Sequence, residues 1–108
     1  MFKNLEQLIQ KIKKQKNKNP KISHTASLMK RGESFCIKKF MEEAKELANS
    51  AKYSIKKNIT HEAVDLLYHF LVLLEFKKIS MTSVMRELKR RQQISGIQEK
   101  KNRKKNVR

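Results

Sequence analysis

The chain has 108 residues and carries 27 lysines and arginines against 10 aspartates and glutamates, a formal charge of +17. This length suffices for one domain, and the two glycines, Gly32 and Gly96, lie too far apart for a glycine-rich phosphate loop. The single cysteine, Cys36, excludes an internal disulfide and a cysteine-ligated zinc site. We therefore expect a reducing, cytoplasmic location, and no signal-peptide pattern opens the chain.

Hydrophobic periodicity predicts helices and no strands, so the expected fold class is all-α, a small bundle of four to five helices. The first helix is expected over about residues 2–12 and ends in a lysine- and asparagine-rich connector. Ser23 is expected to cap a short second helix that stops at Gly32. Ser34 then opens a long third helix that continues to about Lys57.

The fourth helix, expected over residues 61–76 after a break at Asn58 and Thr60, carries apolar residues on almost every side. An all-round apolar helix has to be buried all round, and a chain of this size offers too few partners for that. We therefore expect a homodimer or a dimer of dimers that associates through this helix. The apolar stretch is too short to cross a bilayer, so no membrane partner is expected.

A fifth helix is expected to begin at Ser80 or Thr82 and to end near the second glycine. Residues 1–96 would then form a single domain, followed by a basic tail over 97–108. Basic residues gather toward both ends of the chain, which is typical of solvated tails or of a surface for a polyanion. Most of the acids lie instead in the middle of the chain, and their spacing indicates a site.

Acidic residues share one face on each of the two central helices. Glu42, Glu43 and Glu46 fall within about 100° of one another around a helix, and Glu62 and Asp65 are three residues apart. The chain between the two groups is long enough for one helix to end and the next to return antiparallel, so the acidic faces can meet. Like charges held this close need bound cations or basic partners. Oxygen ligands on facing helices suit magnesium, with manganese as a substitute.

Simpler interpretations exist for each motif. The segment EEAKE is most often a solvated helix face with lysines as ion-pair partners, and Lys38 and Lys39 are by default exposed. A purely structural helical dimer is an alternative that leaves Asp65 in an apolar helix unexplained. A basic helical nucleic-acid-binding protein would agree with the net charge but has no use for the acids, and no recognisable DNA-binding motif is present.

The segments EEAKE and EAVDLLYHFLVLL resemble the EExxE…ExxD signature of the MazG-like all-α nucleoside triphosphate pyrophosphohydrolases. Within that superfamily they are most similar to the phosphoribosyl-ATP pyrophosphohydrolase family of histidine biosynthesis. SHTASLMKRG, KKFMEEAKE and RRQQISGIQEKKNRK resemble further segments of the family, so the resemblance runs from about Pro20 to Arg103. The chain departs from the family's usual residues at His24, Ser27 and Met41, positions on the substrate side.

The resemblance implies hydrolysis of phosphoribosyl-ATP to phosphoribosyl-AMP and pyrophosphate by a magnesium-activated water. It implies that Glu43, Glu46, Glu62 and Asp65 bind magnesium and that Glu42, together with Glu43, is catalytic. A separate phosphoribosyl-AMP cyclohydrolase is the implied functional link, and no specific nucleic-acid partner is expected. A house-cleaning pyrophosphohydrolase for other nucleoside triphosphates would use the same acids and is the alternative. The expected substrate-binding residues are Ser23, Thr25, Lys38, Lys39, Lys100 and Arg103.

Overall fold

The computed structural model describes residues 1–94 and 100–101, which form helices and no strand, so the predicted all-α class is confirmed. The chain divides into two compact units, Met1–Lys78 and Ile79–Arg108. No helix in the described part of the chain has the length and apolar character needed to span a membrane. The first unit contains α1 (Lys3–Gln15), α2 (His24–Arg31), α3 (Glu33–Tyr53) and α4 (Lys56–Phe76), and the second contains α5 (Met81–Gln92).

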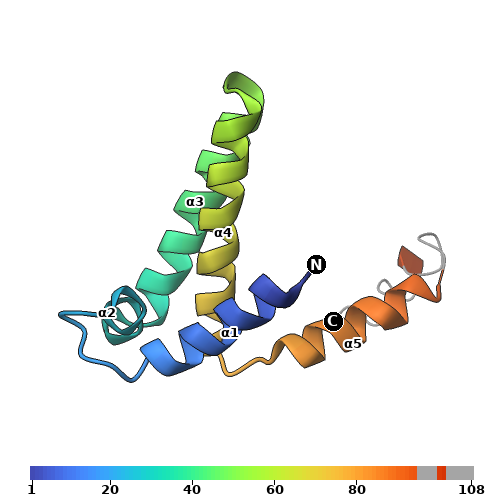
Figure 1. Ribbon diagram of the computed structural model, residues 1–108. Helices are drawn as coiled ribbons and strands as arrows, with labels where there is room; N and C mark the ends of the chain where they lie inside the picture. The colour runs from blue at the N-terminus through green and yellow to red at the C-terminus, as the bar shows by residue number, and fades with distance from the viewer. Residues whose placement is uncertain (95–99, 102–108) are drawn as a thin grey trace. The chain divides into compact units, whose positions relative to one another are not determined.

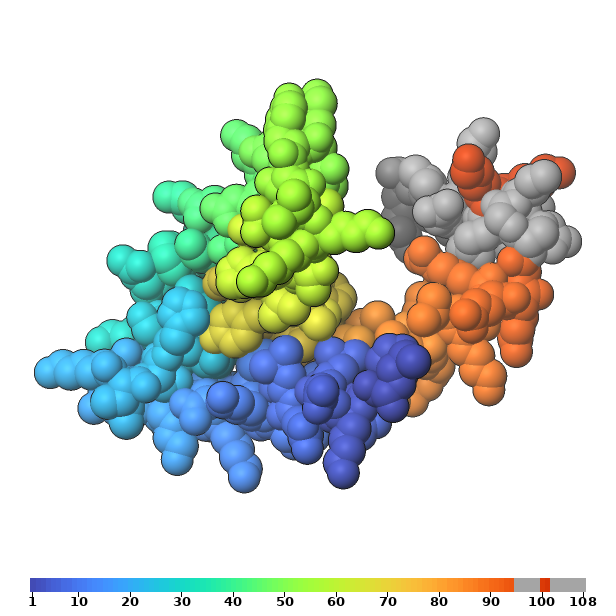
Figure 2. Space-filling view, turned by 45° about the horizontal axis from the view of Figure 1, so that its top comes forward, coloured from blue at the N-terminus to red at the C-terminus, as the bar shows by residue number. Residues whose placement is uncertain are grey.

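The centre of the first unit is an antiparallel hairpin of α3 and α4 (Figure 1). Helices α1 and α2 pack around the end of the hairpin where α3 begins and α4 ends, and Figure 2 shows them gathered there in blue and cyan. The end at which α3 connects to α4, in green, stands clear of both. The buried apolar core lies at the packed end and consists of Ile12, Ala26, Leu28, Cys36, Leu71 and Val72.

Local capping chemistry sets the boundaries of α2 as predicted. The Ser23 hydroxyl accepts a hydrogen bond from the Ala26 backbone N–H at 3.1 Å, and it donates to the Gln15 carbonyl at 3.0 Å. Gly32 ends α2 and immediately precedes α3, with φ at +95°, in the left-handed half of the backbone map that favours glycine. A single residue therefore connects α2 to α3.

The predicted boundary between the two central helices is wrong. Helix α3 ends at Tyr53 rather than near Lys57, and α4 begins at Lys56, five residues before the expected start. Asn58 and Thr60 have the chemistry of a helix cap but lie inside α4. The Thr60 hydroxyl donates to the Lys56 carbonyl, four residues earlier, at 2.9 Å, so it is satisfied within the helix.

Of the two caps predicted for the last helix, Ser80 and Thr82, the structure has Ser80, whose hydroxyl accepts a hydrogen bond from the Ser83 N–H at 3.1 Å. The expected end of that helix near Gly96 lies outside the described residues.

Helix α4 is only partly covered within one chain. Its buried residues, His69, Leu71 and Val72, all belong to its C-terminal half, which packs against the other helices of the unit. Toward its N-terminus the apolar side chains of Val64 and Leu67 are 57% and 38% exposed. The predicted burial on every side is therefore absent from the single chain.

Candidate active site

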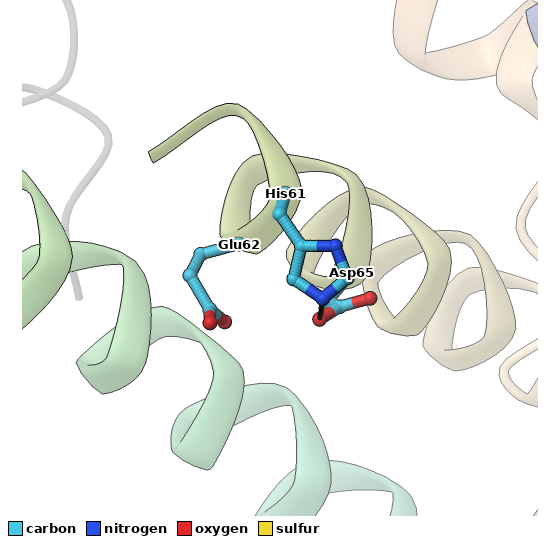
Figure 3. A group of neighbouring side chains, drawn as sticks. All are labelled: His61, Glu62 and Asp65. Atoms are coloured by element: carbon cyan, nitrogen blue, oxygen red, sulfur yellow. Dashed lines mark ion pairs between the residues drawn. The ribbon is translucent and has the colours of Figure 1, made fainter. Parts of the chain in front are cut away.

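Carboxylates from the two arms of the hairpin meet across it, as their spacing predicts. Glu43 and Glu46 on α3 and Glu62 on α4 each place one carboxylate oxygen within 4.8 Å of the others. Figure 3 shows the Glu62 side chain extending from α4 toward α3. These three residues are a candidate cation-binding cluster in the described part of the chain.

A second group on α4 shares Glu62 with the first. Ligand atoms of His61, Glu62 and Asp65 also lie within 4.8 Å of one another, and the His61 Nε2 atom is 3.4 Å from Asp65 Oδ2 (Figure 3). The Asp65 side chain is 41% exposed, so it is less buried than its apolar helix suggested. Sequence analysis missed His61, although its position four residues before Asp65 placed both on one helix face.

Burial raises the pKa values of two carboxyl groups in the cluster, those of Glu43 and Glu62. Burial raises the pKa of the Glu43 carboxyl, the charges of Glu46 and Asp65 raise it further, and Lys39 lowers it. Burial and the same two carboxylates raise the pKa of Glu62. One oxygen of each, Oε2, is buried and has no hydrogen-bond partner among the described residues. Hard anionic oxygens without a donor fit a hard divalent cation, so the donor set is compatible with magnesium.

A histidine from the buried half of α4 reaches the same cluster. The His69 side chain is 8% exposed, and its Nε2 atom lies 3.9 Å from Glu43 Oε1. Burial is the main cause that lowers the pKa of His69, and the positive charge of Lys39 lowers it further. The neutral imidazole is therefore favoured, and it lies beside the Glu43 carboxylate.

A cavity of about 470 Å³ opens beside Glu43 and Asp65. Lys39 also lines it and brings a positive charge to the carboxylates, while its Nζ atom lies 3.1 Å from the exposed Glu42. Glu42 is therefore paired with a lysine and is not among the three clustered carboxylates. The cavity wall is completed by Leu8, His24, Val64, Tyr68 and His69.

The expected substrate-binding residues have different surroundings. The hydroxyl of Ser23 is occupied by the α2 cap, and the Thr25 hydroxyl hydrogen-bonds to the Tyr68 hydroxyl at 2.6 Å. Lys38 is exposed and does not line the cavity, in contrast to Lys39. Lys100 is exposed in the second unit, and Arg103 lies outside the described residues.

A helical hairpin that holds facing carboxylates beside a cavity with one lysine agrees with the resemblance to the all-α nucleotide pyrophosphohydrolases. Residues 5–92 match the family model of phosphoribosyl-ATP pyrophosphohydrolase. The chain belongs to this family, which confirms both the family and the class of enzyme, a pyrophosphohydrolase, that the sequence motifs predict.

Curated relatives align over most of the chain. It is 39% identical to the phosphoribosyl-ATP pyrophosphatase of Dechloromonas aromatica, over 92% of each sequence. It is 41% identical to that of Cereibacter sphaeroides, over 89% of this chain and 93% of the relative. It is 42% identical to the histidine biosynthesis bifunctional protein HisIE of Wolinella succinogenes, where 93% of this chain covers 44% of the longer relative.

Proposed function

We propose that this chain hydrolyses phosphoribosyl-ATP to phosphoribosyl-AMP and pyrophosphate in histidine biosynthesis. The family match and the names of the relatives support the substrate. The structural observation that carries the proposal is that Glu43 and Glu62, on the two arms of one hairpin, have carboxylates close to each other and that each has one buried oxygen without a hydrogen-bond partner among the described residues. Buried carboxylates this close together cost folding free energy when no cation is present, and they form a binding site when one is.

Glu43, Glu46, Glu62 and Asp65 are the residues that would hold magnesium, with manganese as a substitute. Magnesium bound there would neutralise triphosphate charge and lower the pKa of a coordinated water. Each of the four belongs to one of two groups that share Glu62, and this supports the assignment. His61 completes one of the two groups and is a further candidate ligand.

The remaining side chains of the cavity would orient the substrate. Lys39, beside Glu43, supplies a cation for a phosphate oxygen. Glu42 forms a 3.1 Å ion pair with that lysine, which supports a role for Glu42 in positioning Lys39. Glu42 and Glu43 together are the proposed catalytic residues. Substrate contacts by Ser23, Thr25, Lys38, Lys100 and Arg103 stay predictions.

A second copy of the chain is the proposed cover for the exposed apolar side chains of α4. The exposed apolar side chains of Val64 and Leu67 support it, because a helix that is apolar on nearly every side is normally buried on every side. A functional link to a phosphoribosyl-AMP cyclohydrolase is also proposed, as is a cytoplasmic location. The bifunctional name of the Wolinella relative supports the link.

The test is magnesium-dependent release of pyrophosphate from phosphoribosyl-ATP, measured beside ATP, dCTP and dUTP at equal concentrations. We expect phosphoribosyl-ATP to be preferred by kcat/KM. Equal or better turnover of an ordinary nucleoside triphosphate would indicate a house-cleaning enzyme instead. Absence of pyrophosphate release from every substrate would contradict both functions.

A further inference from the structure

A second cavity follows the first along the hairpin, toward the end at which α3 connects to α4. It measures about 360 Å³, within the range of small-molecule sites. Glu46 and Glu62 form part of its wall, whereas Glu43 and Asp65 line the first cavity. The carboxylate cluster therefore lies between two cavities, and a ligand that reacts at the cluster can extend into both.

The two cavities differ in chemistry. The first contains Lys39, the kind of cation that binds phosphate oxygens. Among the described residues that line the second cavity there is no lysine or arginine. Besides the two glutamates, its wall consists of Asn49, Ser50, Tyr53, Ser54, Asn58 and His61. Amides can pair with the N6/N7 edge of adenine, which stays free in phosphoribosyl-ATP because the phosphoribosyl group is on N1, and an aromatic ring can stack on the face of the base.

Ser50 gives an independent indication that this cavity takes a ligand. Its side chain is almost completely buried, at 7% exposure, and its Oγ atom has no hydrogen-bond partner among the described residues. A buried hydroxyl in a folded protein normally has a partner, and a serine within a helix commonly finds one in the carbonyl four residues earlier. Ser50 lines the cavity, and rotation about its Cα–Cβ bond would bring the hydroxyl to a polar ligand there.

We propose that this second cavity binds the adenine base of the nucleotide substrate, with Tyr53 stacked on the ring and Asn49, Ser50 and Asn58 bonded to its edge. The inference rests on the proposed function, and it fixes the direction of the substrate along the hairpin. The base lies toward the α3–α4 connection, the α-phosphate lies at the carboxylates, and the outer phosphates lie toward Lys39.

The experiment compares Tyr53→Ala, Tyr53→Phe and Asn58→Ala by KM for phosphoribosyl-ATP. Inorganic tripolyphosphate, which has no base, serves as a competitive inhibitor. We expect Tyr53→Ala and Asn58→Ala to raise KM about tenfold, as loss of a base contact does, with the tripolyphosphate inhibition constant unchanged. Tyr53→Phe keeps the ring and should retain the wild-type KM. Ile55→Ala is the matched control, because Ile55 is 68% exposed at the same end of the hairpin but does not line the cavity.

An unchanged KM in both alanine variants would overturn the inference while leaving the proposed function intact. A parallel rise in the tripolyphosphate inhibition constant would also overturn it, because the effect would then lie on the phosphate side. Tyr53 is 76% exposed at the last position of α3, so its two variants are expected to fold and can decide the question if Asn58→Ala does not. A wild-type protein that releases no pyrophosphate refutes the proposed function before any variant is compared.

Discussion

One carboxylate oxygen of Glu43, on α3, lies within 4.8 Å of one carboxylate oxygen of Glu62, on α4. The two residues are nineteen positions apart in the chain, and the antiparallel return of α4 brings them together. Because both carboxyl groups have raised pKa values and an unpartnered oxygen, their approach costs folding free energy that a bound cation would recover.

Removal of divalent cations should abolish pyrophosphate release. We expect no turnover in excess chelator and full recovery with magnesium or manganese, because the clustered oxygens suit hard cations. Calcium should raise the melting temperature but support little turnover, since its looser coordination orients water less strictly. Turnover that persists after metal analysis shows a metal-free sample would contradict the assignment.

Glu43→Gln should separate activity from stability. The amide keeps the shape and removes one of the facing charges, so the unfolding free energy of the metal-free protein should be unchanged or higher. Loss of an anionic ligand should lower kcat by more than about 100-fold. This exceeds the usual effect of substituting a residue that only hydrogen-bonds to a metal ligand. Urea denaturation beside a rate measurement checks both. Asp65→Asn is the comparison, since Asp65 is 41% exposed and its substitution should lower turnover with little effect on stability.

The stability of the metal-free protein should depend on pH through Glu43 and Glu62. A carboxyl group whose pKa is raised on folding binds protons more tightly in the folded state. The contribution of these two residues to the free energy of unfolding should therefore fall as pH rises from the unfolded value of 4.5 through the raised values, opposite in sign to the contribution of His69, whose pKa is lowered. Urea denaturation in chelator between pH 4 and pH 7 measures this slope, and the double variant with glutamine at both positions should flatten it. An equal slope in that variant would assign the effect to other groups.

The hydrogen bond between Thr25 and Tyr68 should contribute to stability by joining α2 to α4. Thr25 is buried, at 5% exposure, and the two hydroxyl oxygens are 2.6 Å apart. Thr25→Val leaves the Tyr68 hydroxyl without this partner and should cost about 1–3 kcal/mol. A double-mutant cycle with Tyr68→Phe, followed by urea denaturation, should give a coupling energy of at least about 0.5 kcal/mol. Additive effects of the two substitutions would show that the bond contributes nothing.

Association of two chains should depend on the exposed apolar side of α4. The protein should sediment as a dimer or a larger even assembly at micromolar concentration, and Leu67→Lys should yield monomers, because a buried charge opposes association. Ile22→Lys is the control, since Ile22 is 81% exposed and precedes α2. A wild-type monomer under these conditions would refute the proposed dimer.

The features that sequence analysis predicted correctly depend on local spacing. The Ser23 cap, the Gly32 stop and the approach of Glu43 to Glu62 each follow from residues a few turns apart or from a simple hairpin. The start of α4 was missed because Thr60 has a hydroxyl that can either cap a helix or bond within one, and only the folded chain decides.

Contacts between distant parts of the chain give no such local signal. Lys16, just after α1, pairs with Glu75 near the end of α4, and the sequence separation of 59 residues gives no periodic pattern to detect. The contact of His69 with Glu43 likewise depends on how α4 rotates about its axis against α3. Rotation of this kind is set by packing of the whole unit, which periodicity alone does not determine.

Gly32 is the single residue that connects α2 to α3, so a change in its backbone dihedral angles would tilt α3 relative to α2. Eleven residues of helix, about 16 Å, separate it from Glu43, so a tilt of about 5° at Gly32 would move the far end by more than about 1 Å. A Cβ added at Gly32 meets no atom within 4 Å, so the effect of a side chain there would come through the positive φ alone. A displacement of about 1 Å at a reacting centre can cost about 100-fold in rate. The backbone conformation of Gly32 thus bears on the position of Glu43, eleven residues further along the chain.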